Sequence, residues 1–218
     1  MADRPDARAL YALITAELSP VAAHNPFVDL VEAGSAPVEA LRRIAGEEYR
    51  IIRSDRRSFA LMASRLAEPT GAGELFLSLA QGEGLALGLL PAYATAVGLD
   101  TAALDAYRPR AAAQVYPHYL AWLAQFGTRS EITLALLANF GFWGGYCARI
   151  AAALPRHYDL TTADAAFFAF FADLPPGFEE SALSTLQDGL DSGEDPEAAL
   201  QAARMMQSYE AAFWDSLL

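Results

Sequence analysis

Cysteine and basic residues are scarce in this sequence. Cys147 is the single cysteine, so an internal disulfide is excluded. The 15 Lys and Arg residues against 27 Asp and Glu residues give a formal net charge of -12. Because this charge repels phosphate backbones and anionic lipids, we expect no nucleic acid and no membrane as partner. The first residues, MADRPDAR, contain no apolar signal-peptide segment, which together with the lone cysteine predicts a cytoplasmic protein.

Alternation of apolar and polar residues with period two, the signature of a strand, is also missing. Apolar residues instead recur at helical spacing, and at 54% of the chain they are sufficient for a large core. The sequence therefore predicts one all-α domain over residues 1–218. The expected helices cover 7–22, a short stretch ending at Gly34, 37–66, 71–98 with a kink or break at Pro91, 109–126, 131–154, a phenylalanine-rich segment capped by Thr162 and broken by Pro175-Pro176-Gly177, and the region from Pro196 onward.

Motifs for metals and nucleotides are absent as well. The three histidines, His24, His118 and His157, have no metal-ligand spacing, and we expect structural roles for them. No phosphate-binding or dinucleotide fingerprint follows a strand. We therefore expect no metal and no cofactor.

Three glutamates stand in otherwise apolar helix faces, which makes them candidates for chemistry. Glu48, Glu83 and Glu210 lie on three different long helices, and Asp55 interrupts the same face as Glu48. Burying an ionised carboxylate without a partner costs several kcal/mol, so each must have an arginine partner, a position at the edge of its face, a wet cavity or a shifted pKa. If the glutamates share a cavity, the site has general acid and base groups.

The helix expected over 131–154 has an aromatic inward face with one amide, Asn139. Trp143 and Tyr146 on this face, with Tyr116 from the preceding helix, would suit a flat heterocycle. Cys147 lies one position off the face and is more typical of a small buried side chain than of a nucleophile. Three glycines of this helix would permit close approach of a neighbour: Gly141, Gly144 and Gly145.

The helix order, the early HNPFVDLVEAG and the terminal YEAAFWDSLL resemble the TenA/thiaminase II and PqqC branch of the haem-oxygenase-like superfamily. In that branch a Tyr-Glu-x-x-Phe-Trp pattern carries the catalytic acid, and the resemblance places this role on Glu210. It also places the carboxylate that holds an aminopyrimidine on Glu48, beside Tyr49. Tyr116 and Tyr146 resemble the pocket tyrosines, and the nucleophilic cysteine falls on Phe142, which cannot attack.

The haem-oxygenase-like diiron oxidases offer a second comparison, because HYDLTTADAAFFAFFADLPPGF resembles their ligand-bearing segment. Glu83 is similar to their first glutamate ligand. The other five ligand positions hold residues that do not fit: Leu90, Asn139, Phe171, Pro175 and Phe178. One ligand of six cannot hold two irons, so this resemblance implies no diiron centre.

The leading hypothesis is a metal-free TenA-like protein that acts on or binds a small aromatic or heterocyclic molecule, such as an aminopyrimidine of thiamin salvage. Glu210, Glu48 and Tyr146 are the expected catalytic residues. The expected substrate-binding residues are Tyr49, Glu83, Tyr116, Asn139, Phe142, Trp143 and Phe171. A cofactor-independent relative of the oxidases, a plain ligand-binding protein and, less favoured by the charge, a transcriptional regulator are the alternatives. The resemblance also implies a homodimer or homotetramer.

Overall fold

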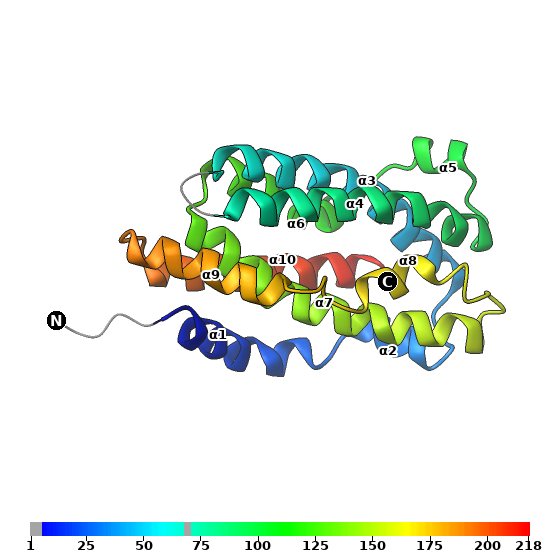
Figure 1. The fold of residues 1–218 in the computed structure, drawn as a ribbon. Coiled ribbons are helices and arrows are strands. Elements are labelled where there is room, and N and C mark those ends of the chain that lie inside the picture. The colour runs from blue at the N-terminus through cyan, green and yellow to red at the C-terminus, as the bar shows by residue number, and fades with distance from the viewer. Residues whose placement is uncertain (1–5, 68–70) are drawn as a thin grey trace.

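The computed structural model describes residues 6–67 and 71–218, and these residues form ten α-helices (Figure 1). The all-α prediction is confirmed, since no strand is present in these two ranges. The helices are α1 (Ala7–Ala22), α2 (Pro26–Glu32), α3 (Val38–Arg65), α4 (Ala72–Ala96), α5 (Thr101–Ala106), α6 (Ala111–Phe126), α7 (Arg129–His157), α8 (Ala166–Phe171), α9 (Phe178–Asp191) and α10 (Pro196–Ser216).

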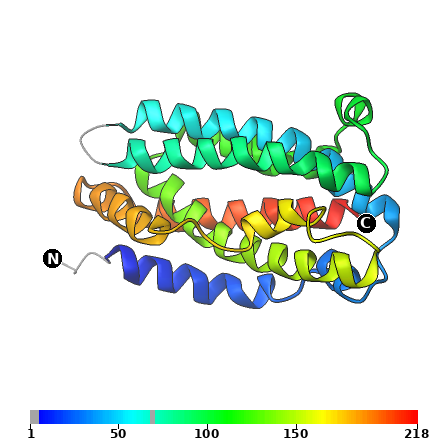
Figure 2. The same ribbon diagram turned by 45° about the vertical axis from the view of Figure 1, so that its right-hand side comes forward.

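The long helices α7 and α10 form the middle of the bundle (Figure 2). On one side lie α3 and α4, which pack against each other, together with α6, which contacts both α3 and α10. On the other side α1 and α2 cover α7, and α8 and α9 pack along it. The α3–α4 pair therefore faces α7 and α10 across the interior.

Local sequence signals explain where the central helices begin. Thr128 Oγ1 accepts from the Glu131 backbone N–H at 3.2 Å, and Glu131 Oε2 accepts from the Thr128 backbone N–H at 2.7 Å. This reciprocal pair satisfies two backbone donors at the start of α7. At α10, the Asp195 side chain accepts from Glu197 N–H, and Pro196 occupies the first turn, where its missing N–H costs nothing.

The structure corrects three details of the predicted helix pattern. Pro91 does not break α4, and beyond the proline the Tyr93 hydroxyl still donates to the Leu41 carbonyl of α3 at 2.8 Å. Thr162 does not cap α8; Thr161 instead exchanges hydrogen bonds with Asp164 in the turn before that helix. The short α5 and the 14-residue α9 were not predicted. After the break at Pro175-Pro176, Gly177 adopts a φ of 76° and a new helix begins at Phe178.

The core consists of two clusters of buried apolar side chains. One surrounds Phe59 and Phe76, and the other surrounds Phe27, Tyr93 and Phe168. Tyr116 and Phe142 pack against both clusters. The interior between α3–α4 and α7–α10 is therefore flanked by two packed regions.

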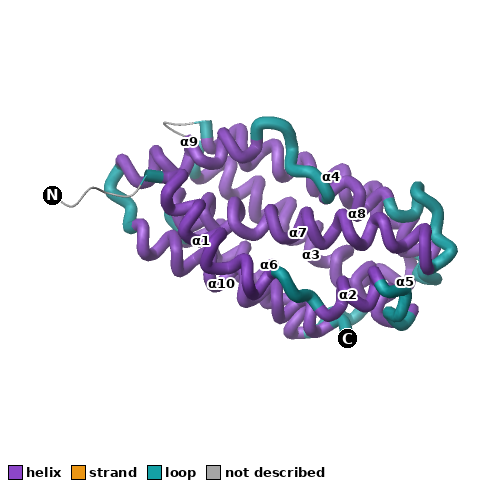
Figure 3. The backbone as a smooth tube through the Cα atoms, turned by 90° about the horizontal axis from the view of Figure 1, so that it is seen from below, coloured by secondary structure: helices purple, strands orange, loops and turns teal. Residues whose placement is uncertain are grey.

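Among the described residues, α4 is the one helix long and apolar enough to cross a membrane by length and composition, with a mean hydropathy of 1.3. Core helices of soluble proteins also pass this criterion. Figure 3 shows α4 as one member of the helix bundle, and its Glu83 faces an interior cavity. The expectation that no membrane is involved stays a prediction.

Candidate active site

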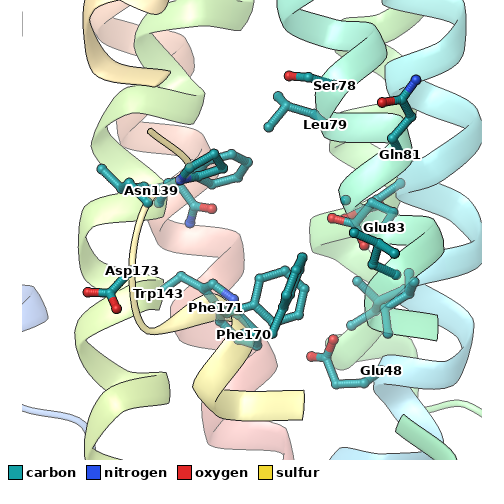
Figure 4. Close-up of a pocket in the computed structure, with 18 of the residues that line it drawn as sticks. Glu48, Ser78, Leu79, Gln81, Glu83, Asn139, Trp143, Phe170, Phe171 and Asp173 are labelled. Carbon is teal, nitrogen blue, oxygen red and sulfur yellow. The ribbon is translucent and has the colours of Figure 1, made fainter. Parts of the chain in front are cut away.

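A cavity of about 480 Å³ lies between α3 and α4 on one side and α7, α8 and α10 on the other (Figure 4). Its rim includes Leu85 and Leu174, which are 63% and 37% exposed. This volume is typical of sites for small molecules. The polar lining side chains that matter most are Glu48, Asp55, Glu83, Tyr116, Asn139 and Glu210, and the aromatic ones are Phe140, Trp143, Phe170, Phe171 and Phe213.

Glu210 is the most firmly held carboxyl group of the cavity. Asn139 Nδ2 donates to its Oε2 at 2.5 Å, and Trp214 Nε1, one turn later on α10, donates to its Oε1 at 3.1 Å. Burial raises the pKa of Glu210 to about 8, while the hydrogen bond from Trp214 acts in the opposite direction. Glu210 therefore exchanges its proton near neutral pH and is held in one orientation.

Glu48 and Asp55 come from α3, where seven residues, or about two helical turns, place both side chains on one face. Glu83 of α4 faces the same space. Burial raises the pKa of Glu48 and of Asp55 well above the usual range, and the charge of Glu83 adds to both shifts. Burial also raises the pKa of Glu83 to about 8. Asp55 was not predicted as a site residue, although it interrupts the same apolar face as Glu48.

Tyr116 brings a hydroxyl group from α6 to these carboxyl groups. Burial raises its pKa well above the usual value, and the charges of Asp55, Glu210, Glu83 and Glu48 add to the shift. The phenol therefore stays protonated across the physiological range. It can donate a hydrogen bond to a ligand or to a carboxylate.

The structure does not bring Tyr49, Tyr146 or Phe142 to this cavity. Tyr49 follows Glu48 by about 100° around α3, so its hydroxyl leaves the cavity face and donates to Asp105 at 2.7 Å. Tyr146 donates to the Ala22 carbonyl at 2.7 Å. Phe142 is partly buried and packs against the two core clusters.

The two α7 residues that face the cavity four positions apart are Asn139 and Trp143. The resemblance had suggested Phe142 and Tyr146 for positions with this spacing. A displacement of three residues turns a side chain by only about 60° around a helix, so the apolar pattern alone does not distinguish the two registers. Neither register provides a thiol.

Cys147 lies outside the cavity and is fully buried. Burial raises the pKa of its thiol well above the usual value, and the charges of Glu48 and Glu210 add to this. A thiol in these surroundings is not a nucleophile at neutral pH. Gly144, on the same helix, would place a Cβ only 3.1 Å from the Phe171 carbonyl oxygen, whereas Gly141 and Gly145 have no neighbour within 4 Å. Close approach was therefore predicted correctly for Gly144 alone.

The residues at the sites of the oxidase ligands do not fit a diiron centre. Leu90 is fully buried in the core, and the ring of Phe171 lines the cavity. Within the ranges 6–67 and 71–218, no group of three or more His, Cys, Asp and Glu side chains has an arrangement that could hold a metal ion. The histidines His24, His118 and His157 do not line the cavity.

Comparisons with solved structures show the same fold at low sequence identity. A domain of unknown function with a heme oxygenase-like fold from Shewanella denitrificans has 16% identity and a TM-score of 0.76, over 99% of this chain and 93% of that chain. A TenA homolog from Pseudomonas syringae pv. tomato has 12% identity and a TM-score of 0.79, over 100% and 97%. A TenA family transcription regulator from Silicibacter has 18% identity and a TM-score of 0.75, over 95% and 96%.

A comparison with curated proteins finds no match. The sequence model of the TENA/THI-4/PQQC family, in contrast, matches residues 16–218. This match covers every helix that lines the cavity, and it confirms the resemblance drawn from the sequence. The chain belongs to the TENA/THI-4/PQQC family.

Proposed function

We propose that this protein binds a small, flat aromatic or heterocyclic molecule in the cavity and acts on it by acid–base chemistry without a metal. Aromatic rings from three helices would hold the flat faces of the ligand. The carboxyl groups and the Tyr116 hydroxyl would hold its polar edge. An aminopyrimidine related to thiamin salvage is one candidate, and an intermediate of secondary metabolism is another.

The observation that carries this proposal is the state of Glu210. Its pKa of about 8 lets it hold a proton near neutral pH, and Asn139 and Trp214 fix the orientation of its carboxyl group. A general acid needs this combination of an available proton and a fixed position. Glu48 would anchor the ligand or act as the base.

Cleavage through a covalent thiol intermediate does not belong to this proposal. The cavity positions on α7 hold Asn139, Phe140 and Trp143, and the thiol of Cys147 is buried outside the cavity. We therefore expect thiamin hydrolysis to be weak or absent. Asn139 has no nucleophilic group, and its side chain would instead orient Glu210 through its hydrogen bond.

A two-stage experiment tests the proposal. A thermal-shift screen with pyrimidines, quinones and aromatic amino acids identifies a ligand, because a molecule that binds the folded state raises its melting temperature. Turnover of that ligand or its derivatives is then measured in Glu210→Gln, which keeps the size of the side chain and removes its acidic proton. We expect turnover to fall by roughly 10²-fold or more.

Cys147→Ser serves as the control for thiol chemistry, and we expect its turnover to stay nearly unchanged. A silent Glu210→Gln together with an inactive Cys147→Ser would overturn the proposed mechanism. A ligand that binds tightly but is never converted would make the protein a non-catalytic ligand carrier.

The remaining parts of the proposal concern partners. One structural relative is called a transcription regulator, but the net charge of -12 speaks against direct binding of DNA by this chain. A binding assay with random duplex at low salt checks this.

Elemental analysis after growth in iron-rich medium checks the metal-free state, and light scattering checks the expected dimer or tetramer. A cytoplasmic location also stays a prediction.

A further inference from the structure

The cavity wall formed by α3 and α4 carries three carboxyl groups, Glu48, Asp55 and Glu83. Figure 4 shows Glu48 and Glu83 on this wall, opposite Asn139 and Trp143. The charge of Glu83 is the leading carboxylate influence on both Glu48 and Asp55, so the three groups form one cluster. We call these three residues the acidic wall.

No positive group of residues 6–67 and 71–218 compensates the acidic wall. The chain contains no lysine, and no arginine or histidine of the described ranges lines the cavity. Tyr116, Asn139 and Glu210 are the polar groups that face the acidic wall from α6, α7 and α10, while Asp173 is exposed at the rim. Asn139 is already used by Glu210.

Asp55 gives independent evidence that the acidic wall awaits a donor. Its side chain is only 3% exposed and lines the cavity, yet Oδ1 has no hydrogen-bond partner. Buried acceptors of this kind are rare in folded proteins, because an unmet acceptor costs about 1–3 kcal/mol. Within the described part of the chain, Glu48 and Glu83 have no hydrogen-bond or ion-pair partner either. A ligand that donates several hydrogen bonds would satisfy all three.

Charge and shape together define that ligand. Burial favours the protonated form of these carboxyl groups, and a cation would favour their ionised form. An anionic or neutral ligand would not provide this stabilisation. A protonated amine supplies three donors and a positive charge. A flat group attached to the amine would pack against the rings of Trp143, Phe171 and Phe213. The electron-rich faces of these rings would also attract a nearby cation.

We propose that the ligand of this cavity is an organic cation, in which a protonated amine binds the acidic wall and an attached flat ring packs against the aromatic side of the cavity, where Trp143 and Phe171 contact each other edge to face. The inference rests on the proposed function, since it names the chemical class of the ligand for that same cavity. It adds that binding depends on positive charge and that Asp55 is the central group of recognition.

Three probes of nearly equal size separate charge from shape: tryptamine is a cation at pH 7, tryptophol is neutral and indole-3-propionate is an anion. We expect calorimetry to show tryptamine binding at least about tenfold more tightly than tryptophol, with indole-3-propionate weakest. Because the cation favours the ionised carboxylates, tryptamine should also release protons. Its apparent binding enthalpy should therefore differ between phosphate and Tris buffers, whereas that of tryptophol should not.

Asp55→Asn keeps the shape of the side chain and removes its charge. We expect this change to weaken the binding of tryptamine by about tenfold and to leave the affinity for tryptophol unchanged. Unchanged binding of tryptophol also shows that the variant is folded. Asp215→Asn, on the exposed side of α10, is the matched control for net charge and should change neither. An equal loss in both variants, or equal affinity for all three probes, overturns the inference and leaves the aromatic pocket standing. If none of the probes binds although the thermal-shift screen finds a ligand, the inference is wrong and the proposed function stands. If neither experiment finds a ligand, the proposed function is wrong, and the inference falls with it.

Discussion

Two consecutive glutamates on α3 are both buried, since Glu47 is 0% and Glu48 is 3% exposed, but they differ in their hydrogen bonding. Glu47 accepts three hydrogen bonds, from Tyr107 Oη at 2.9 Å, from the Arg110 backbone N–H at 2.8 Å and from Gln114 Nε2 at 2.6 Å. Glu48 accepts none within the described ranges and faces a cavity lined by other carboxyl groups. One buried carboxyl group is part of the scaffold, and the other is left for a ligand.

This difference shows that burial alone does not mark a functional carboxylate. Glu47 joins α3 to the start of α6, and the ring of Tyr107 packs so closely that a Cβ on Gly46 would lie 2.4 Å from it. Glu48 connects no two helices through a hydrogen bond. Its burial therefore costs desolvation free energy that no hydrogen bond offsets. A desolvated carboxyl group without a partner inside a cavity is typical of binding and catalytic sites.

The largest expected effect comes from replacing each glutamate by methionine, which has a similar length and no charge. Glu47→Met would leave three donors without an acceptor, and we expect it to lower the free energy of unfolding by about 2–4 kcal/mol. Glu48→Met would remove a desolvated carboxyl group beside Glu83, and we expect a change within about 1 kcal/mol of zero.

Urea denaturation at pH 7, followed by circular dichroism, measures both changes on one scale. The comparison requires that Glu47→Met be clearly the less stable variant. Equal destabilisation in the two variants would mean that Glu48 has structural partners after all, and the case for a ligand at the acidic wall would be lost.

The raised pKa values predict a pH dependence of stability, which is the next effect in size. Burial raises the pKa of Glu210 from its usual value of about 4.5 to about 8, so the folded state holds a proton in this window that the unfolded state has released. Stability should therefore fall as pH rises from about 5 to about 8, by up to about 1.4 kcal/mol per pH unit for each such group.

Glu210→Gln removes the contribution of one group, so we expect a flatter dependence of the free energy of unfolding on pH between 5 and 8. Glu180→Gln, on the exposed side of α9, removes a carboxyl group outside the cavity and is the control. If both variants keep the slope of the wild type, Glu210 is ionised in the folded protein at neutral pH and cannot be the proton donor.

The helices and the interior carboxylates were predictable because one physical signal covers both. A helical period of apolar residues identifies the buried face, so a polar residue on that face, such as Glu210 or Asn139, must point inward. The same pattern included Asp55. The structure adds that Asp55 Oδ1 has no hydrogen-bond partner. This depends on the spatial arrangement of α3 and α4 and cannot be predicted from either helix alone.

The apolar pattern selected Glu48 for the inward face, but it did not show that Glu47 is buried as well, and it assigned both Trp143 and Tyr146 to the site. The reason is geometric. Each pair lies within about 100° around its helix, so packing against neighbouring helices decides which member faces the cavity. Tyr146 is turned toward Ala22 at the end of α1, and Glu47 is turned toward Gln114 of α6. The six-residue α5 was missed because its pattern is brief, and the 14-residue α9 was missed although a helix can begin again after the break at Pro175-Pro176.

The smallest effect tests whether the cavity wall, and not only its charges, is fixed by packing. Gly144→Ala would place a Cβ 3.1 Å from the Phe171 carbonyl oxygen, and Phe171 forms part of the cavity. A rigid backbone neighbour cannot yield easily, so we expect a loss of about 1 kcal/mol and weaker ligand binding. The matched control is Gly145→Ala, an exposed position with no neighbour within 4 Å, where better helix propensity should add roughly 0.5–1 kcal/mol. Urea denaturation of the two variants should therefore give changes of opposite sign. A gain in stability from Gly144→Ala would show that the segment after α8 moves freely, and the cavity would then be shaped by its ligand more than by close packing of α7 against this segment.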